Sequence, residues 1–277
     1  MIALERDRGA IAPRFLGANR RMHLLALYSA AARGLLTDKE TKKRIFSSTH
    51  WAPSKEQLGL ETHGKCAFCE APNSATYYGD VEHFRPKSVY WWLAYCYDNY
   101  LYSCRICNGT KSDLHTFGGD ALIAPQVHGQ MTDDELIALA DVFSPSPTDA
   151  GAVAAYDVLC RAELGGLPNP YQEEPEDLFV WEAYPDVGEV RIAPAPGNPR
   201  ALQAFEAVTS ITGLNRAELL TQRFRTFELA KRIFDQASLL PDPHRQPLLD
   251  IVRDLTDSRL PFSAMMRYFV RQWGLLP

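Results

Sequence analysis

The chain has 277 residues, of which 46% are hydrophobic and 23% charged, so disorder is excluded as its main state and a soluble globular protein is expected. Its formal net charge of −5 is unevenly distributed: residues 1–62 carry 11 basic and 6 acidic side chains, residues 63–115 carry 5 of each, and the remainder carries 13 against 23. A basic front suits contact with a polyanion, and chance scatter of surface charge is an equally good explanation.

Neither export nor a membrane span is indicated. Four charged residues follow one another from Glu5 to Arg8, with no apolar stretch behind them, which favours a cytoplasmic protein. The longest nearly uncharged apolar run, residues 89–97, is about half of the ~20 residues that cross a bilayer. We therefore expect no membrane partner.

The basic N-terminal region, residues 1–62, is expected to be helical. Residues 22–35 place apolar side chains at helical spacing and end near Gly34, and residues 54–60 offer a shorter helix with Ser54 as its N-cap. These two segments predict a helical N-terminal region.

Short strands and an aromatic loop follow. Residues 76–83 and 100–103 are rich in strand formers, and Pro86 stops the first of these strands from continuing. Residues 87–99 hold so many aromatic side chains that we expect them to pack as a small core of their own. A short helix is expected after Cys107.

The second half of the chain predicts one strand pair and several helices. The strands fall in residues 179–181 and 189–192, around a turn with Pro185 and Gly188. Four segments carry apolar residues at helical spacing: residues 199–211, 216–240, 248–256 and 262–273. An acidic, helical second half suits either a partner-docking surface or a plain core.

Four of the six cysteines form two pairs of identical spacing. The pairs are Cys66-x2-Cys69 and Cys104-x2-Cys107. Such a turn brings two thiolates to one side of a loop, and two turns supply the four ligands of a structural zinc site. Redox dithiols or disulfides are the competing interpretation. A cytoplasmic location disfavours structural disulfides, and two such pairs in one chain disfavour a thioredoxin-like redox site. The remaining cysteines, 96 and 160, are expected to be small buried hydrophobes.

Polar residues that can carry chemistry lie between the two cysteine pairs. Glu82 and His83 close the first predicted strand, Asn99 opens the second, and Asn108 follows the last cysteine. A carboxylate, a carboxamide oxygen and an imidazole are the groups that a hard divalent cation and a water nucleophile require. The adjacent Glu82 and His83 point to opposite faces unless the strand ends there, which the nearby proline favours.

These residues resemble a known motif. The segments Cys66 to Cys69, Asp80 to Pro86, Asp98 to Leu101 and Cys104 to Lys111 are similar to the HNH, or ββα-metal, endonuclease motif with zinc knuckles. The resemblance implies an α+β fold with a zinc-stapled ββα-metal (HNH) core embedded in a largely helical protein.

The resemblance also implies roles for single residues. His83 becomes the general base that takes a proton from the attacking water, and Asn99 orients it by hydrogen bonds to the loop backbone. Glu82 and Asn108 become the ligands of one Mg²⁺ or Mn²⁺. Glutamate stands where aspartate is usual, and asparagine where histidine is usual, and the carboxamide favours an oxygen-loving metal.

Four cations near the motif are candidate phosphate contacts, with solvated surface charge as the alternative. They are Arg85, Lys87, Arg105 and Lys111.

A narrower resemblance concerns residues 65–70, 167–179 and 209–215, which look like the PtuB-like HNH subunit of Septu-type anti-phage systems. That subunit works beside an ATPase, so the resemblance implies an ATPase partner. Residues 117–166 look longer than the family's usual connection.

Together these observations predict four regions. They are a basic helical segment (1–62), an HNH nuclease core (63–117), an inserted connection (118–166) and a mainly helical domain (167–277). The expected function is metal-dependent endonuclease cleavage of DNA in anti-phage defence. Two alternatives stay open: an RNA nuclease, for instance on tRNA, that uses the same site, and a non-catalytic zinc-stabilised nucleic-acid-binding or adaptor module.

Overall fold

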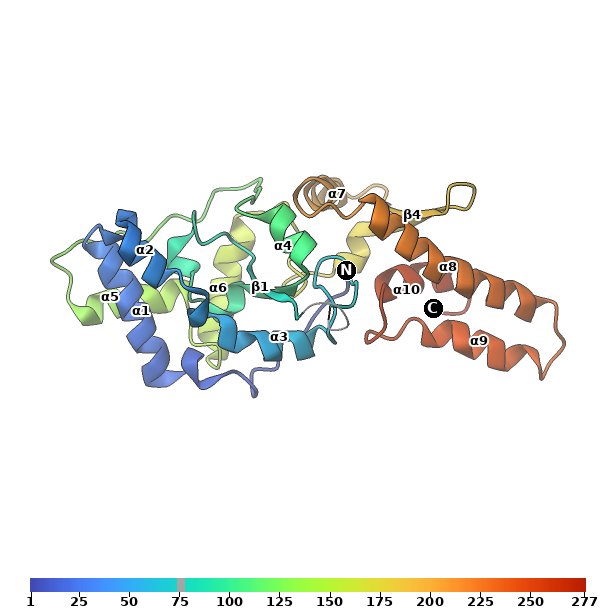
Figure 1. Ribbon diagram of the computed structural model, residues 1–277, viewed down its shortest axis with the longest axis horizontal. Coiled ribbons are helices and arrows are strands. Elements are labelled where there is room, and N and C mark those ends of the chain that lie inside the picture. Colours follow the sequence, from blue (N-terminus) through green and yellow to red (C-terminus); the bar gives the residue numbers. More distant parts are fainter. Residues whose placement is uncertain (74–77) are drawn as a thin grey trace.

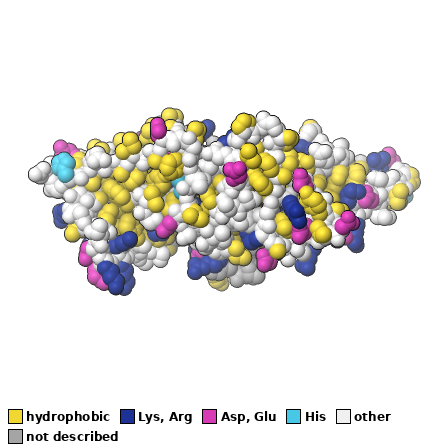
Figure 2. Space-filling view, turned by 90° about the horizontal axis from the view of Figure 1, so that it is seen from above, with side chains coloured by type: hydrophobic (Ala, Val, Ile, Leu, Met, Phe, Trp, Pro, Cys, Tyr) yellow, Lys and Arg dark blue, Asp and Glu magenta, His cyan; other side chains and the backbone are white. Residues whose placement is uncertain are grey.

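The computed structural model describes residues 1–73 and 78–277. It confirms the α+β class: about half of the chain is helical, and the strands form two small sheets. The molecule is elongated, with α1 and α5 at one end and α8 to α10 at the other (Figure 1). One long face mixes hydrophobic side chains with scattered charges of both signs (Figure 2). No helix in the described ranges is long and apolar enough to cross a membrane.

The N-terminal region is helical, as predicted. Helix α1 (Gly17–Ala32) begins earlier than the expected segment and ends before Gly34, whose φ of +69° suits glycine. The sequence analysis missed α2 (Lys39–Ile45), which Asp38 caps by accepting a 2.8 Å hydrogen bond from Thr41 N. Helix α3 (Lys55–Glu61) matches the second prediction, although the Ser54 hydroxyl donates to Trp51 O instead of capping the helix.

The middle of the chain forms the first sheet. Strands β1 (Asp80–His83) and β2 (Tyr100–Ser103) pair antiparallel, with His83 opposite Tyr100. Residues 76 and 77 of the predicted first strand lie outside the described residues. Helix α4 (Arg105–Lys111) follows β2, and Cys104 Sγ accepts a 3.3 Å hydrogen bond from Cys107 N at its start. The sequence predicted both strands and this helix.

The aromatic loop between β1 and β2 is packed, as expected. Its buried residues share one hydrophobic cluster with α1, α5 (Asp133–Phe143) and α6 (Ala150–Ala162). Residues 118–166 thus contain two helices, and their apolar faces cover the loop. Two hydrogen bonds of α5 form a capping box between Thr132 and Glu135.

The C-terminal part closes against the cysteine-bearing core. Strands β3 (Phe179–Tyr184) and β4 (Glu189–Pro194) form the second sheet, near the predicted positions. The four predicted helices are confirmed within a few residues at each end: α7 (Pro199–Ile211), α8 (Ala217–Ser238), α9 (Arg245–Asp254) and α10 (Ser263–Gln272). Their apolar faces share a hydrophobic cluster with Cys66, Cys69 and Cys107.

Candidate functional site

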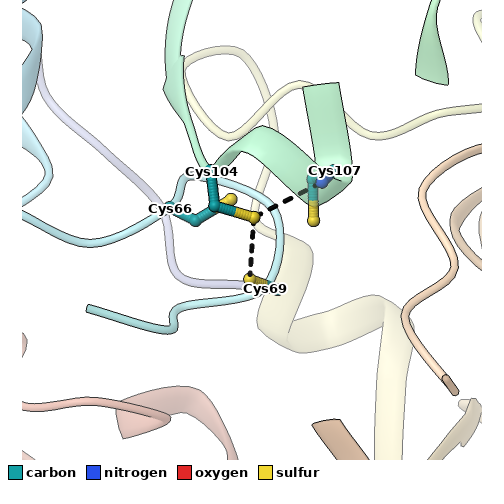
Figure 3. Close-up of side chains that lie close together, drawn as sticks. All are labelled: Cys66, Cys69, Cys104 and Cys107. Atoms are coloured by element: carbon teal, nitrogen blue, oxygen red, sulfur yellow. Dashed lines mark hydrogen bonds between the residues drawn. The ribbon is translucent and has the colours of Figure 1, made fainter. Parts of the chain in front are cut away.

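The two cysteine pairs converge, as their spacing predicted. The first pair comes from the loop before β1, and the second from the junction of β2 and α4 (Figure 3). All four Sγ atoms lie within 4.8 Å of one another, and those of Cys69 and Cys104 are 3.9 Å apart. Tetrahedral zinc with Zn–S bonds of about 2.3 Å separates its sulfurs by about 3.8 Å, whereas a disulfide needs about 2 Å. The cluster therefore fits a structural metal such as zinc.

The surroundings of the cluster raise the pKa of Cys66 and Cys107 and lower the pKa of Cys69 and Cys104, and the thiolate is the form that binds metal. Hydrogen bonds from Cys107, Cys66 and Cys69 lower the pKa of Cys104 well below its ordinary value. Arg216 Nη1 lies 3.6 Å from Cys107 Sγ. Burial alone lowers the pKa of Arg216, but the charges of the cysteines outweigh burial and raise it. This arginine supplies positive charge beside a site that becomes anionic when four thiolates bind one divalent cation.

A cavity of about 580 Å³ collects three of the four predicted catalytic residues, and two of its lining residues, Arg105 and Asn108, directly follow Cys104 and Cys107 in the chain. Its walls come from β1, from α4 and from the segment before α3. The polar and charged lining residues are Ser48, Lys55, Asp80, Glu82, His83, Lys87, Arg105, Asn108, Ser112 and Asp113. Strand β1 ends at His83, so the adjacent Glu82 and His83 both reach this cavity. The sequence analysis predicted that these two side chains converge if the strand ends at this point.

His83 is held in the form that a general base requires. Its ring is buried, with 5% of the residue exposed, and packs against Trp51 and Tyr100. Its Nε2 lies 3.0 Å from Ala94 O, and because a carbonyl only accepts, Nε2 carries the proton. The Nδ1 of the neutral ring then keeps its lone pair. Burial, followed by the charge of Lys87, lowers the pKa of His83 to about 3, so the ring is neutral at physiological pH.

Glu82 and Lys111 form a buried ion pair in the wall of the cavity. Lys111 Nζ lies 2.7 Å from Glu82 Oε1 and also donates a 3.0 Å hydrogen bond to His83 O. Burial raises the pKa of Glu82, and the charge of Lys111 opposes this shift. One ammonium group thus fixes both the Glu82 carboxylate and the backbone of His83.

Asn108 and Asp80 both line the cavity and lie next to each other. Asn108 Nδ2 donates a 2.9 Å hydrogen bond to Asp80 Oδ2, which leaves the carboxamide oxygen as a possible ligand atom. Arg105 lies 3.6 Å from the same carboxylate oxygen. The sequence analysis did not single out Asp80 as a site residue. Its position two residues before Glu82 in a strand, hence on the same face, was the signal that could have found it.

Asn99 lies outside the cavity and ties together the chain that flanks it. Its Oδ1 accepts a 2.8 Å hydrogen bond from Arg85 N, and its Nδ2 donates a 3.0 Å bond to Arg85 O. The Asn99 carbonyl accepts from Phe84 N at 2.8 Å. These bonds hold the two residues that directly follow His83.

Two of the four expected phosphate contacts have other partners. Arg85 is 2% exposed, and its Nε lies 2.6 Å from Glu163 Oε2. Lys111 is fully buried against Glu82. Burying a cation without a counter-charge is costly, so each cation occupies the interior beside a carboxylate instead of facing a phosphate. Lys87 and Arg105 do line the cavity.

Glu163 is a buried hub that sequence reasoning missed. Its carboxylate accepts hydrogen bonds from Arg85, from His115 Nε2 at 3.2 Å and from the Tyr90 hydroxyl. It thereby ties the end of α6 to the chain after His83. A lone glutamate at the end of a predicted insertion carries no pattern that reveals this role.

Comparisons with known proteins give one partial similarity. No family model and no solved structure matches the chain. The Septu protein PtuB of Bacillus mycoides (strain KBAB4) is 39% identical over 67 residues, a match that covers 20% of this chain and 23% of that protein. The chain is therefore similar to Septu protein PtuB over less than a quarter of the relative's length.

Proposed function

We propose that the protein is a metal-dependent endonuclease of the HNH type that hydrolyses phosphodiester bonds in DNA. The observation that carries this proposal is the cavity in which a neutral, buried histidine lies beside two carboxylates and a carboxamide. The partial similarity to Septu protein PtuB supports a role in anti-phage defence beside an ATPase partner.

His83 acts as the general base in this proposal. Ala94 O fixes the ring through Nε2, so Nδ1 can accept the proton of a water molecule in the cavity. Asn99 and Lys111 hold the backbone on either side of the histidine, and Asn99 is thus a positioning residue.

The donor set near His83 suits a hard divalent cation. Glu82 and Asn108 would hold Mg²⁺ or Mn²⁺, with Asp80 as a further oxygen donor next to Asn108. Such a cation supplies stabilisation of the negative charge that develops on the scissile phosphate and on the leaving oxygen. The charge of Lys111 favours the ionised form of Glu82, because it opposes the effect of burial, which raises the pKa of Glu82.

Cations at the mouth of the cavity suit a phosphate substrate. Lys55, Lys87 and Arg105 line it, and 76% of the Arg105 side chain is exposed. Lys87 Nζ lies 5.1 Å from the centre of the Trp51 ring, which also lines the cavity. These side chains can contact a nucleic-acid backbone on both sides of the bond to be cleaved.

The test is cleavage of supercoiled plasmid and of total tRNA with Mg²⁺ or Mn²⁺, compared with Ca²⁺. The wild type should cleave plasmid, and His83→Ala should lose this activity while it keeps its metal at the cysteine cluster. His128→Ala, which changes an exposed histidine outside the cavity, is the matched control and should cleave like the wild type. The ATPase encoded beside the gene, where there is one, is added in a parallel series.

Two outcomes favour the alternatives. Cleavage of tRNA but not plasmid, lost in His83→Ala, assigns the same site to RNA. Tight nucleic-acid binding with no cleavage of either substrate, and an unchanged biological activity in His83→Ala, identifies a binding module.

A further inference from the structure

A group of unpaired cations lies next to the cavity. Residues 39–55 contain five basic side chains and one acidic one. We call the five basic residues the basic strip: Lys39, Lys42, Lys43, Arg44 and Lys55. None of them forms an ion pair with any residue in the ranges 1–73 and 78–277, and the first four are exposed.

Most cations in the C-terminal half, in contrast, lie beside a carboxylate. There, carboxylates pair with eight arginines or lysines: Arg191, Arg200, Lys231, Arg232, Arg253, Arg259, Arg267 and Arg271. The basic strip therefore combines a high local charge with an absence of intramolecular partners among the described residues. An unpaired cluster of this kind is available to an external polyanion.

The strip is joined to the cavity along the chain: Lys55 itself lines the cavity, and α2 ends three residues before the lining residue Ser48. Three of its members occupy the last turn of α2, and the Arg44 carbonyl lies 3.1 Å from His50 Nε2, within hydrogen-bond distance. The following residues, Ser48, Trp51 and Lys55, line the cavity itself. A chain that binds α2 can thus pass directly over the candidate nuclease site.

The side chains of the strip favour a duplex over a single strand. Proteins that bind single strands usually stack unpaired bases on exposed aromatic rings, whereas duplexes are held by cations on phosphates. Between residues 39 and 55, all of which the structure describes, the two aromatic side chains other than histidine are Phe46 and Trp51. Phe46 is half-buried against the core and Trp51 is buried. The strip offers charge but no stacking surface.

We propose that the basic strip binds the phosphate backbone of duplex DNA and guides it into the cavity between β1 and α4. This inference rests on the proposed function for the identity of the cavity. It assigns part of the substrate affinity to α2, which lies outside the HNH motif.

The test compares two triple variants of the full chain. Lys42→Gln/Lys43→Gln/Arg44→Gln removes three charges from the strip. The matched control, Arg225→Gln/Lys231→Gln/Arg232→Gln, removes three charges from α8 at the far end of the molecule (Figure 1). Binding to a duplex of about 30 base pairs is measured by fluorescence anisotropy at several salt concentrations. Ca²⁺ replaces Mg²⁺ to prevent cleavage, because EDTA could also strip metal from the cysteine cluster.

The expected result is a smaller salt dependence for the strip variant only. Each lost phosphate contact lowers the slope of log K against log salt by about 0.9. When salt is raised from about 50 to about 200 mM, three phosphate contacts weaken DNA binding by about 40-fold in the wild type. The strip variant should lack this part of the salt-induced loss. Equal slopes and affinities for both variants would overturn the proposal. So would a strip variant that loses single-stranded RNA binding but keeps duplex DNA.

Binding and cleavage separate this inference from the proposed function. DNA binding that depends on the strip, in a wild type that cleaves nothing with Mg²⁺ or Mn²⁺, supports the strip and contradicts the nuclease. Cleavage lost in His83→Ala, with binding that does not depend on the strip, supports the nuclease and contradicts the strip.

Discussion

Replacing Arg85 by methionine tests whether this cation is structural, as its buried position indicates, or a phosphate contact. Arg85 is 2% exposed, donates to Glu163 at 2.6 Å and to Cys160 O at 3.0 Å, and Glu163 is completely buried. Arg85→Met leaves the Glu163 carboxylate in the interior without its arginine, with hydrogen bonds from Tyr90 and His115 among the described residues. Removing one member of such a pair costs about 3–5 kcal/mol of stability.

A double-mutant cycle sharpens this prediction. Glu163→Leu alone should cost a similar amount, because it leaves the Arg85 guanidinium unpaired. The double variant Arg85→Met/Glu163→Leu removes both charges of this pair, so its loss should be clearly smaller than the sum of the two single losses. Urea unfolding at pH 7, followed by tryptophan fluorescence, gives all four free energies of unfolding. Lys87→Met is the control and should change stability by less than about 1 kcal/mol, since Lys87 makes a cation–π contact with Trp51 and forms no ion pair with the residues that the structure describes.

The pH dependence gives an independent check on the same pair. Burial alone raises the pKa of Glu163, but the hydrogen bond from His115 and the charge of Arg85 lower it from 4.5 to about 2. A depressed native pKa means that the carboxylate contributes stability above pH 4.5 and that this contribution is lost as the pH falls from 4.5 towards 2. Glu163→Gln should therefore flatten the acid side of the stability profile.

One result would refute the structural role of the pair. Suppose that the free energy of unfolding of Arg85→Met lies within about 1 kcal/mol of the wild-type value and that the variant binds DNA more weakly. Arg85 is then a phosphate contact, as the sequence alone suggested.

Three further predictions concern the metal centre and the cavity. Cys104→Ser should lower the zinc released per chain and destabilise the fold, since metal binding and folding are coupled; a folded, fully zinc-loaded variant contradicts the cysteine site. Because the pKa of His83 is lowered to about 3, kcat/KM should show no acid limb from this group above about pH 5, and a limb near pH 6.5 contradicts the buried base. Lys111→Met removes the charge that opposes burial at Glu82, so the pKa of Glu82 should rise. Metal-dependent cleavage should then fall at neutral pH and recover in more alkaline buffer, which a rate profile from pH 6 to 9 measures.

Local patterns were enough to predict much of this fold. The x2 spacing of the cysteines fixes the turn that presents both thiolates, so the cluster could be inferred without tertiary information. Pro86 and the short β-rich runs located β1 and β2 for a similar reason. The C-terminal helices were predicted from apolar spacing alone, because each packs one face against the core.

The errors and omissions have a common physical cause. Helix α2 has little apolar periodicity, and its cap at Asp38 was the remaining signal. Arg85 meets a carboxylate 78 residues away, and Lys111 meets one on a different element. Charge pairs made by folding leave no trace in local spacing, so a cation in a motif cannot be assigned to solvent, substrate or interior from the sequence.

The packed aromatic loop limits how far the candidate nuclease module can be separated from its host. A sheet of two short strands is at best marginally stable by itself. Here the loop that joins β1 to β2 buries its rings against α1, which precedes it in the chain, and against α5 and α6, which follow it. A fragment of residues 63–117 would expose that apolar surface. Attempts to transplant the active site as an independent cassette should therefore carry both flanking regions, whereas loops that leave this core untouched are the places to insert or fuse other domains.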